Sequence, residues 1–335
     1  MKIVVFGPEQ RVGAWEGDSI IDLNRAFASY LRERGETAAA QTADARVPAR
    51  LEAFILGGPA ALDDARRAIE HAAARGTAAA PDGGAIVYPA GEVKLHAPWP
   101  GRRIACVGGN YADHLMGMEA RRRGGPVTLE EVTQAAKERG QWGFWKVPAE
   151  VAGPDEDIPY PSRTRYLDYE GEAAIVISSR GRDIPAGRIG DYVWGVTLFH
   201  DWSIRDDPWS TMPMSYNRAK NFDGSTSMGP CIVVGELDPQ NVDVELRVND
   251  QVRQHYNTRD MIWSFAEVLE YLSRDFTFVP GDVIAGGTAA GTAADKTPPG
   301  PDGTRSTELF LKVGDVVEVS SPQIGRLRNR IVQAS

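Results

Sequence analysis

The spacing of hydrophobic residues divides the chain at about residue 98. Before this point, short β-branched runs predict three strands, at Lys2–Phe6, Val12–Trp15 and Ser19–Leu23. Three stretches with helical spacing follow, from Asn24 to about Arg34, Pro48–Leu56 and Pro59–Arg75. Each stretch has a glycine just past its end, and the last two begin with proline, as helices prefer. We therefore expect a small α+β domain over residues 1–98, closed by the proline-rich segment His96–Gly101.

After residue 98, short apolar runs bounded by Gly, Asp and Pro replace the helical spacing and predict strands. The expected strands are Ile104–Val107, Glu172–Ser178, Val193–Phe199, Ile232–Val234, Val242–Val248, Val252–Gln254, Val283–Ala285, Leu309–Leu311 and Val316–Val319. Capping boxes predict two helices, from Thr128 to about Gly140 and from Ser264 to about Ser273. There is no βαβ alternation, which argues against Rossmann and TIM-barrel folds. We expect an α+β, mainly β, architecture over residues 99–335.

The composition indicates a folded globular protein. Of the 335 residues, 42% are hydrophobic and 25% are charged, which excludes a disordered chain. The 37 Lys plus Arg against 46 Asp plus Glu give a net charge of −9, so we expect no nucleic-acid partner. No apolar run approaches the ~18 residues of a membrane span, so we expect no membrane partner. Cys106 and Cys231 lie in apolar settings that predict buried free thiols, and we expect a cytoplasmic protein.

Three acidic residues stand where apolar strands are expected to begin or end. Glu170 and Glu172 are two residues apart at the mouth of a predicted strand, so their side chains project from the same face. Asp201 comes at the end of the run that begins at Val193, where it can converge on the two glutamates. Three carboxylates without spaced Cys or His ligands predict an oxygen-only site for Mg²⁺, Mn²⁺ or Ca²⁺. The alternative is a solvated strand end with surface acids.

Seven sequence blocks occur in order along the chain. They are VGGNYADH (Val107–His114), DYEGE (Asp168–Glu172), FHDWSIRD (Phe199–Asp206), AKNFDGSTSMGP (Ala219–Pro230), VNDQVRQHYNTRDMIWS (Val248–Ser264), VPGDVIAGGTAAG (Val279–Gly291) and the tail GDVVEV…IGRLRNRIV. With these blocks the chain resembles the fumarylacetoacetate hydrolase family. The resemblance implies a mixed β-roll catalytic domain over residues 99–335 behind a small N-terminal domain. It also implies a homodimer that acts on a small-molecule 2-oxo acid.

The resemblance further implies a role for individual residues. The metal ligands, for which Mg²⁺ is expected, with Mn²⁺ or Ca²⁺ as alternatives, are Glu170, Glu172 and Asp201. The catalytic residues are His114, as base, and Lys220, which would hold developing negative charge or return a proton. The substrate-binding residues are Arg205, Thr288, Tyr111 and Lys146. A histidine suits the role of base because its unperturbed pKa of about 6.5 is close to the working pH.

The segment around the histidine departs from the family pattern. Many relatives pair the histidine with a glutamate three residues later, whereas this chain has Gly117 there. Glu119 is the nearest substitute and is therefore a further candidate catalytic residue. Residues 115–143 form a longer segment than is common, and we expect either a lid that suits a different or bulkier substrate, or an element that packs on the dimer partner. The aromatic residues of such a lid would be Trp142, Phe144 and Trp145.

The activity that the resemblance implies is divalent-metal-dependent hydrolysis of a C–C bond in acylpyruvates or 1,3-diketo acids, such as those from aromatic ring cleavage. Breaking that bond leaves a carbanion, which a Lewis acid stabilises as a metal-bound enolate. The family's decarboxylases, isomerases and 2-keto-3-deoxy sugar acid dehydratases use the same enolate. These activities are the main alternative, and the missing glutamate favours them. A non-catalytic binding protein that has kept the fold is a third hypothesis.

Overall fold

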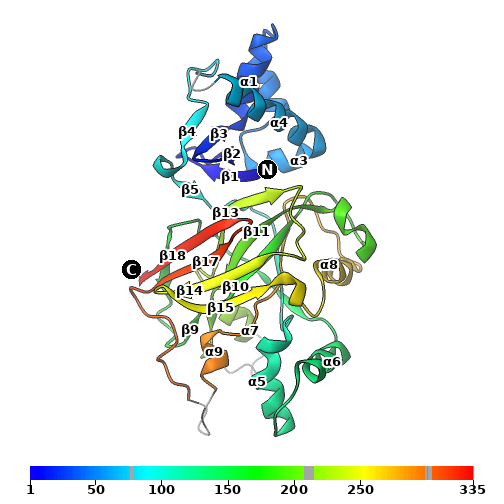
Figure 1. The fold of residues 1–335 in the computed structure, drawn as a ribbon, viewed down its shortest axis with the longest axis vertical. Helices are drawn as coiled ribbons and strands as arrows, with labels where there is room; N and C mark the ends of the chain where they lie inside the picture. The colour runs from blue at the N-terminus through cyan, green and yellow to red at the C-terminus, as the bar shows by residue number, and fades with distance from the viewer. Residues whose placement is uncertain (76–78, 207–214, 299, 301–303, 335) are drawn as a thin grey trace.

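Two β-sheets form the centre of the molecule in the computed structural model, which describes residues 1–75, 79–206, 215–298, 300 and 304–334. Within these residues the larger sheet has 11 strands and the smaller has five. Figure 1 shows the N-terminal helices at one end of the molecule, and helices α5 (Ala112–Arg123) and α6 (Leu129–Arg139) at the other. The mixed, sheet-dominated architecture expected from the sequence is confirmed. None of the described helices is long and apolar enough to span a membrane.

The larger sheet joins the N-terminal strands to those of the rest of the chain. Its strands are β1 (Lys2–Phe6), β2 (Arg11–Glu16), β3 (Ser19–Asp22), β4 (Val87–Pro89), β5 (Leu95–His96), β6 (Ile104–Val107), β7 (Gly143–Lys146), β10 (Gly171–Ile177), β11 (Val193–Asp201), β13 (Thr226–Val234) and β16 (Val283–Ala285). Their order is β4-β3-β2-β1-β13-β11-β10-β16-β6-β7, with β5 beside β1. Because β1 pairs with β13, the strands of residues 1–98 belong to the same sheet as strands from the rest of the chain.

The smaller sheet packs against one face of the larger one. Its strands, in spatial order, are β15 (Gln251–Asn257), β14 (Asp243–Val248), β17 (Val316–Ser321), β18 (Gly325–Gln333) and β8 (Asp157–Tyr160). Leu246 and Val319 of this sheet belong to the same buried cluster as Ile175 and Leu198 of the larger one. The turn Asn249-Asp250 joins β14 to β15, and both residues have positive φ, as a type I′ hairpin turn requires. A separate pair consists of β9 (Leu167–Asp168) and β12 (Ser203–Ile204).

Four N-terminal helices share a second buried cluster with the opposite face of the larger sheet. They are α1 (Leu23–Glu33), α2 (Ala39–Arg46), α3 (Leu51–Leu56) and α4 (Gly58–Arg75). Asp22 caps α1 by accepting a hydrogen bond from the backbone of Arg25. Phe54 of α3 meets Trp194 of β11 edge to face, at 6.1 Å between ring centroids. The sequence predicted three of these helices and missed α2, whose small and polar residues give little amphipathic contrast.

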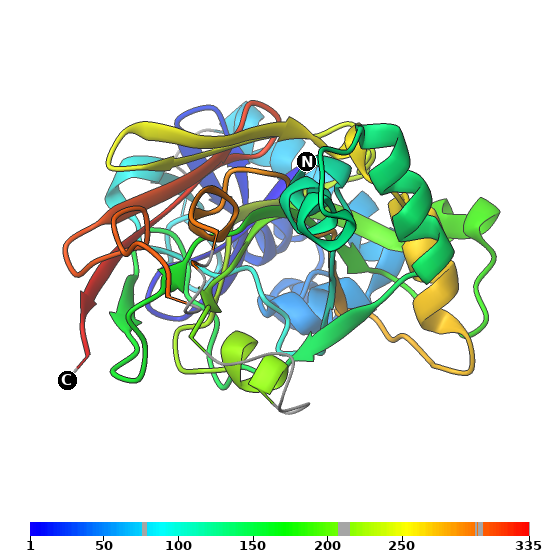
Figure 2. The same ribbon diagram turned by 90° about the horizontal axis from the view of Figure 1, so that it is seen from below.

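The helices of the remaining chain separate into those that the sequence predicted and those that it did not. The two predicted helices, α6 and α8 (Phe265–Ser273), begin at capping boxes formed by Thr128 with Glu131 and by Ser264 with Glu267. Helices α5, α7 (Ser215–Lys220) and α9 (Ala293–Lys296) were not predicted. Short 3₁₀ helices occupy Ala90–Glu92, Ala186–Asp191 and Thr258–Asp260. Seen from below, α5 and α9 lie on the same side of the sheets, with α6 beside α5 (Figure 2).

One predicted strand is wrong, and the sequence did not predict β4, β5, β7, β8, β9, β12 and β18. Leu309–Leu311 is irregular, although the backbone N–H of Leu311 donates to Leu167 O at 2.9 Å. Phe310 and Leu311 are buried in the core cluster, and Leu309 is partly buried against it. The tail segment that became β18 was not predicted, because arginine occupies every second position. In β18 these arginines form the solvated face, while Leu327 and Ile331 are buried.

Candidate metal centre and active site

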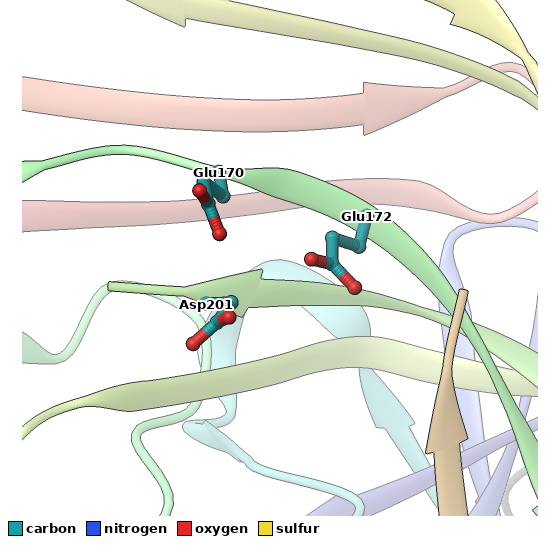
Figure 3. A group of neighbouring side chains, drawn as sticks. All are labelled: Glu170, Glu172 and Asp201. Carbon is teal, nitrogen blue, oxygen red and sulfur yellow. The ribbon is translucent and has the colours of Figure 1, made fainter. Parts of the chain in front are cut away.

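Glu170, Glu172 and Asp201 lie together at the adjoining ends of two central strands (Figure 3). Glu170 directly precedes β10, Glu172 is its second residue, and Asp201 ends β11. In the antiparallel pairing Glu172 lies opposite Phe199, two residues before Asp201. One carboxylate oxygen of each acid lies within 4.8 Å of those of the other two, and all three residues are buried. The convergence expected from the sequence is therefore confirmed.

Two buried lysines bind this acidic triad. Lys220 Nζ donates to Glu170, to Asp201 Oδ2 at 2.7 Å and to Ser203 Oγ at 2.6 Å. Lys146 Nζ donates to Asp201 Oδ1 at 2.6 Å and to the backbone oxygen of Lys220 at 2.7 Å. An ammonium has three N–H donors, so the hydrogen bonds of Lys220 are all used within the cluster. The structure thus places Lys146, expected to bind substrate, as a fully buried partner of Asp201.

The carboxylates of the triad differ in their electrostatic surroundings. Burial by itself raises the pKa of Glu170, but the charges of Lys220 and Arg205 bring that pKa well below its usual value. Burial and the charges of Asp201 and Glu170 raise the pKa of Glu172 well above its usual value. The hydrogen bond from the Gly287 backbone N–H at 2.9 Å offsets only part of this cost. A buried, oxygen-only donor set in which Glu172 faces like charges suits a hard divalent cation.

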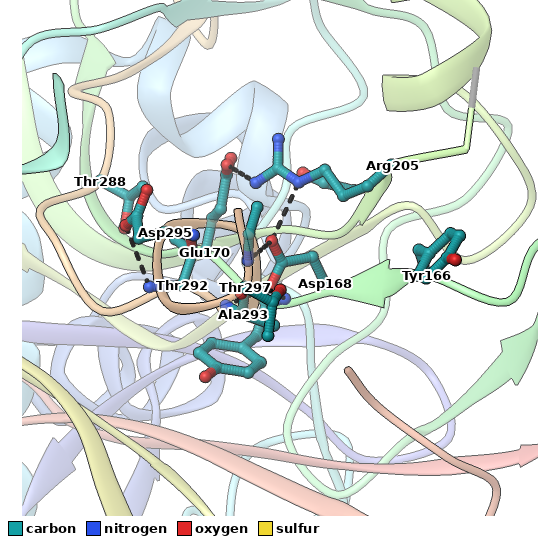
Figure 4. A network of polar contacts seen from close by, with 12 residues as sticks. Tyr166, Asp168, Glu170, Arg205, Thr288, Thr292, Ala293, Asp295 and Thr297 are labelled. Carbon is teal, nitrogen blue, oxygen red and sulfur yellow. Dashed lines mark hydrogen bonds and ion pairs between the residues drawn. The ribbon is translucent and has the colours of Figure 1, made fainter. Parts of the chain in front are cut away.

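Arg205 connects the triad to a fourth buried acid, Asp168. Its guanidinium donates to Glu170 through Nη2 and to Asp168 Oδ2 through Nε, the latter at 2.9 Å. Asp168 also accepts the backbone N–H groups of Ala293 at 2.8 Å and Ala294 at 3.1 Å, which open helix α9 (Figure 4). Arg205 is therefore oriented by two carboxylates, and one of these also anchors α9.

His114 stands in the first turn of α5 and pairs with Asp295 of α9. Its Nδ1 lies 2.9 Å from Asp295 Oδ2. Burial lowers the pKa of His114, but the Asp295 carboxylate outweighs this and raises the pKa above its usual value. The negative charge of Glu170 also raises the pKa of His114, so the imidazole interacts electrostatically with the triad. Sequence reasoning missed Asp295, although Thr292 and Asp295 have the spacing of a capping box and could have revealed α9.

The structure does not pair Glu119 with His114, which corrects the sequence-based expectation. The Glu119 carboxylate accepts hydrogen bonds from Arg122 at 2.6 and 3.0 Å, from Arg123 at 2.8 Å and from Arg139 at 3.0 Å. These guanidinium groups hold the pKa of Glu119 well below its usual value. Because Arg139 belongs to α6, Glu119 joins the two helices of the α5–α6 hairpin. Its carboxylate is thus a structural centre of the hairpin.

Two further residues expected to bind substrate are linked to Gly171, which lies between Glu170 and Glu172, directly or through one neighbour. Thr288 donates to the backbone oxygen of Gly171 at 2.9 Å and accepts from Gln254 Nε2 at 2.8 Å. Tyr111 is buried, with its ring 4.9 Å from that of Tyr256. Thr288 therefore contacts the backbone between Glu170 and Glu172, and Tyr111 packs on Tyr256, whose hydroxyl donates to the same Gly171 oxygen at 2.7 Å. Direct contact of either residue with substrate stays a prediction.

The aromatic residues assigned to a lid are distributed among three surroundings. Trp142 lies against the backbone of Gly108, where an added Cβ would come within 2.3 Å of its ring. Phe144 lies beside the triad, with Lys220 Nζ 5.3 Å from its ring centroid. Trp145 packs on Phe276 at 5.0 Å between centroids. Only Phe144 is thus placed at the acids, and closure of the hairpin over substrate stays a prediction.

Comparison with known proteins gives a match over most of the chain. The family model described as fumarylacetoacetate (FAA) hydrolase C-terminal matches residues 103–332. The chain is 32% identical over 344 residues to oxaloacetate tautomerase FAHD2B, mitochondrial, from Homo sapiens, which covers 99% of this chain and 92% of that protein. Both the predicted catalytic region and the N-terminal part are included in this likeness.

Solved structures match over the whole length as well. The fumarylacetoacetate hydrolase of Exiguobacterium antarcticum superimposes with a TM-score of 0.70 at 28% identity and covers 100% of both chains. The maleylpyruvate hydrolase of Sphingobium sp. SYK-6, in complex with manganese(II) and pyruvate, gives a TM-score of 0.69 and covers 100% of both chains. At 22% identity, the second likeness concerns the fold.

Proposed function

The chain belongs to the fumarylacetoacetate hydrolase family, and from this premise we propose that it is a divalent-metal-dependent enol–keto tautomerase of a short 2-oxo dicarboxylate of the oxaloacetate type. The observation that carries the proposal is one site that combines a buried acidic triad with the His114–Asp295 pair. The likeness to an oxaloacetate tautomerase over nearly the whole chain supports the choice of reaction. Tautomerisation moves one proton between oxygen and carbon and breaks no C–C bond.

The acids of the proposed site would hold the cation. Glu170, Glu172 and Asp201 supply carboxylate oxygens, the ligands that Mg²⁺ and Mn²⁺ prefer. When bound, such an ion would stabilise negative charge on the oxo and carboxylate oxygens of the substrate, a contribution of several kcal/mol. Lys220 and Lys146 hold the acids in place, because each donates to the triad. We assign Lys220 to this supporting role, since direct proton return to substrate would cost it one of these hydrogen bonds.

His114 is the proposed proton-transfer group. Asp295 accepts from Nδ1, so that Nε2 is the ring atom that exchanges a proton with substrate. A carboxylate partner fixes both the tautomer and the direction of the ring, and it makes Nε2 a stronger base. The charge of Glu170 acts on the same imidazole, as expected if the proton is transferred beside the triad.

Hydrolysis of the C–C bond in an acylpyruvate is the second candidate. The observation that favours it is again the His114–Asp295 pair, because a histidine held by a carboxylate can take a proton from water. The glycine at position 117 is therefore no argument against water activation. Decarboxylation and isomerisation use the same enolate and are separated from hydrolysis by their products.

The test is a substrate panel run on the purified protein with added Mg²⁺ or Mn²⁺. We expect the enol form of oxaloacetate to be converted to the keto form, and His114→Asn to lose ~10²–10⁴-fold of that rate. The matched control is His255→Asn, which alters an exposed histidine and should keep the full rate. Pyruvate plus a carboxylic acid from an acylpyruvate would identify the hydrolase instead. A wild-type rate on enol-oxaloacetate no faster than buffer with the metal alone would refute the tautomerase.

A further inference from the structure

Helix α9 is short, but the side chains of Thr292, Asp295 and Asp168 accept hydrogen bonds from the backbone N–H groups at its N-terminus. It comprises Ala293–Lys296, and Thr292 caps it by accepting from the backbone N–H of Asp295 at 3.2 Å. In return Asp295 Oδ2 accepts from the N–H of Thr292 at 3.2 Å and from that of Gly291 at 3.1 Å. These backbone hydrogen bonds therefore orient the Asp295 carboxylate independently of its contacts with other side chains.

The same carboxylate oxygen receives His114. The distance from Asp295 Oδ2 to His114 Nδ1 is 2.9 Å, across 181 residues of sequence. The helix that carries His114 offers no other carboxylate to the ring, since Asp113 accepts from the backbone N–H of His114 and Glu119 is bound by three arginines. Asp295 is thus the residue that can set the direction of the imidazole.

Asp168 ties this arrangement to the acidic triad. Its Oδ1 accepts from Ala293 N at 2.8 Å, and its Oδ2 accepts from Ala294 N at 3.1 Å and from Arg205 Nε at 2.9 Å. Asp168 is fully buried, so these bonds are not exchanged with water. Arg205 continues to Glu170. One chain of contacts therefore runs from His114 through Asp295, α9, Asp168 and Arg205 to Glu170, and Figure 4 shows its members from Asp295 onward.

We propose that Asp295 and Asp168 are positioning residues: Asp295 orients His114, and Asp168 fixes α9 so that the imidazole and Glu170 keep one relative placement. This inference rests on the proposed function, in which His114 transfers the proton. A group that transfers a proton must lie within hydrogen-bond reach of the reacting atom, and misplacement of about 1 Å can cost ~10²-fold in rate. The two aspartates differ in their contacts. Asp295 contacts His114, whereas Asp168 contacts both the backbone of α9 and Arg205, which binds Glu170.

The experiment compares Asp295→Asn and Asp168→Asn with the matched control Asp113→Asn in the full-length protein. The side-chain NMR titration of His114 and the affinity for Mn²⁺ are measured without substrate, and kcat and KM are measured on enol-oxaloacetate. For Asp295→Asn we expect a lower His114 pKa, a ~10–100-fold lower kcat, nearly unchanged KM and wild-type Mn²⁺ affinity. Asp295→Glu should restore part of kcat. Asp113→Asn should match the wild type in all four readouts.

For Asp168→Asn we expect two effects together: a changed His114 titration and a ~10–100-fold weaker affinity for Mn²⁺. If that variant does not fold, Ala293→Pro serves instead, because it removes one N–H that Asp168 accepts. Thr292 already has the extended backbone, with φ −57° and ψ 158°, that precedes proline well. An unchanged His114 titration in Asp295→Asn would overturn the role of Asp295. An effect of Asp168→Asn on Mn²⁺ alone would overturn the connection through α9.

The readouts separate this inference from the proposed function. If the wild type does not act on enol-oxaloacetate but Asp295→Asn still lowers the His114 pKa, the positioning stands and the substrate is wrong. If the wild type is active and Asp295→Asn keeps the wild-type His114 pKa and the wild-type kcat, the proposed function stands and the positioning role is refuted.

Discussion

The acids of the site lie on, or directly before, two central strands of the larger sheet, whereas the histidine lies on helix α5 at the lower end of the molecule. Glu172 and Asp201 are placed by the antiparallel register of β10 and β11, and no more than 5% of any triad residue is exposed. His114 is placed by a contact between α5 and α9, and 18% of its side chain is exposed. A strand register fixes a side chain through many backbone bonds, whereas a helix–helix contact depends on a few side chains.

The comparison teaches where the site tolerates change. On the acid side, Glu170 and Asp201 accept hydrogen bonds from buried lysines, so the loss of either carboxylate leaves a buried cation with one partner fewer. On the histidine side, the Asp295 carboxylate orients the imidazole of His114. Both side chains are partly exposed, so Asp295 can be replaced without disrupting the buried core. We therefore expect variants on the acid side to affect metal binding and stability most, and variants on the histidine side to affect catalysis and its pH dependence.

The largest effect is expected from Glu172→Gln. Glutamine can keep the hydrogen bond from Gly287 but removes one of the three carboxylate charges. Mn²⁺ affinity should fall by more than the ~10–100-fold that is typical when only a supporting group is lost, and the metal-dependent activity should fall with it. Isothermal titration calorimetry on the metal-free protein measures the affinity, with the exposed Glu130→Gln as control. Wild-type affinity in Glu172→Gln would remove this residue from the metal site.

A stability measurement compares the two sides directly. Lys146→Met leaves Asp201 with one buried cationic partner fewer and should lower the free energy of unfolding by about 3–5 kcal/mol. His114→Asn breaks a half-buried contact and should cost about 1 kcal/mol. Urea unfolding of the metal-free proteins gives both values. Equal costs for the two variants would mean that the histidine side is as rigid as the acid side.

The His114–Asp295 pair should make the free energy of unfolding depend on pH. Burial and the charge of Arg205 lower the pKa of His114, but Asp295 and Glu170 raise it further, so the folded-state pKa lies above the unfolded value of about 6.5. The pair's contribution is then fully present below about pH 6.5 and is lost as the pH rises through the raised pKa. Burial raises the pKa of Asp295, but His114 brings it below its usual value, so its contribution is lost only as the pH falls through that lowered pKa.

The wild type should therefore exceed His114→Asn in stability most at mildly acidic pH, and the difference should shrink on the alkaline side. Urea unfolding at several pH values measures it. In the same range kcat/KM should rise with pH as the imidazole loses its proton, because a base must be neutral. A stability difference that grows toward alkaline pH would contradict an ion pair at this position.

The smallest effect on catalysis is expected from Glu119→Gln. Its carboxylate holds Arg122 and Arg123 of α5 and Arg139 of α6 but does not meet His114. The variant should keep kcat/KM within about tenfold of the wild type while its melting temperature falls, more at low salt than at high salt. Calorimetric melting at two salt concentrations measures this, with Glu130→Gln as the control. A loss of ~10²-fold in kcat with a lower His114 pKa would restore Glu119 as the histidine's partner.

The strands and the acids could be predicted because their evidence is local. Alternating or continuous apolar residues marked β10 and β11, and an acid at the end of a strand has few places to point. The capping boxes of α6 and α8 were equally local. Helix α5 gave no such evidence, because Gly117 interrupts it and three consecutive arginines end it. Its contacts with α6 include the ion pair between Glu119 and Arg139, which spans 20 residues of sequence.

The sequence by itself determined the family, the sheet-dominated fold and the convergence of Glu170, Glu172 and Asp201, since each follows from ordered motifs or from the two-residue period of a strand. Only the tertiary structure decided the partner of the histidine. The nearest glutamate in sequence, Glu119, is bound by arginines, while Asp295 reaches the ring from a helix 181 residues away. Sequence distance sets which residues are neighbours within one element, but the packing of separate elements sets which charges meet.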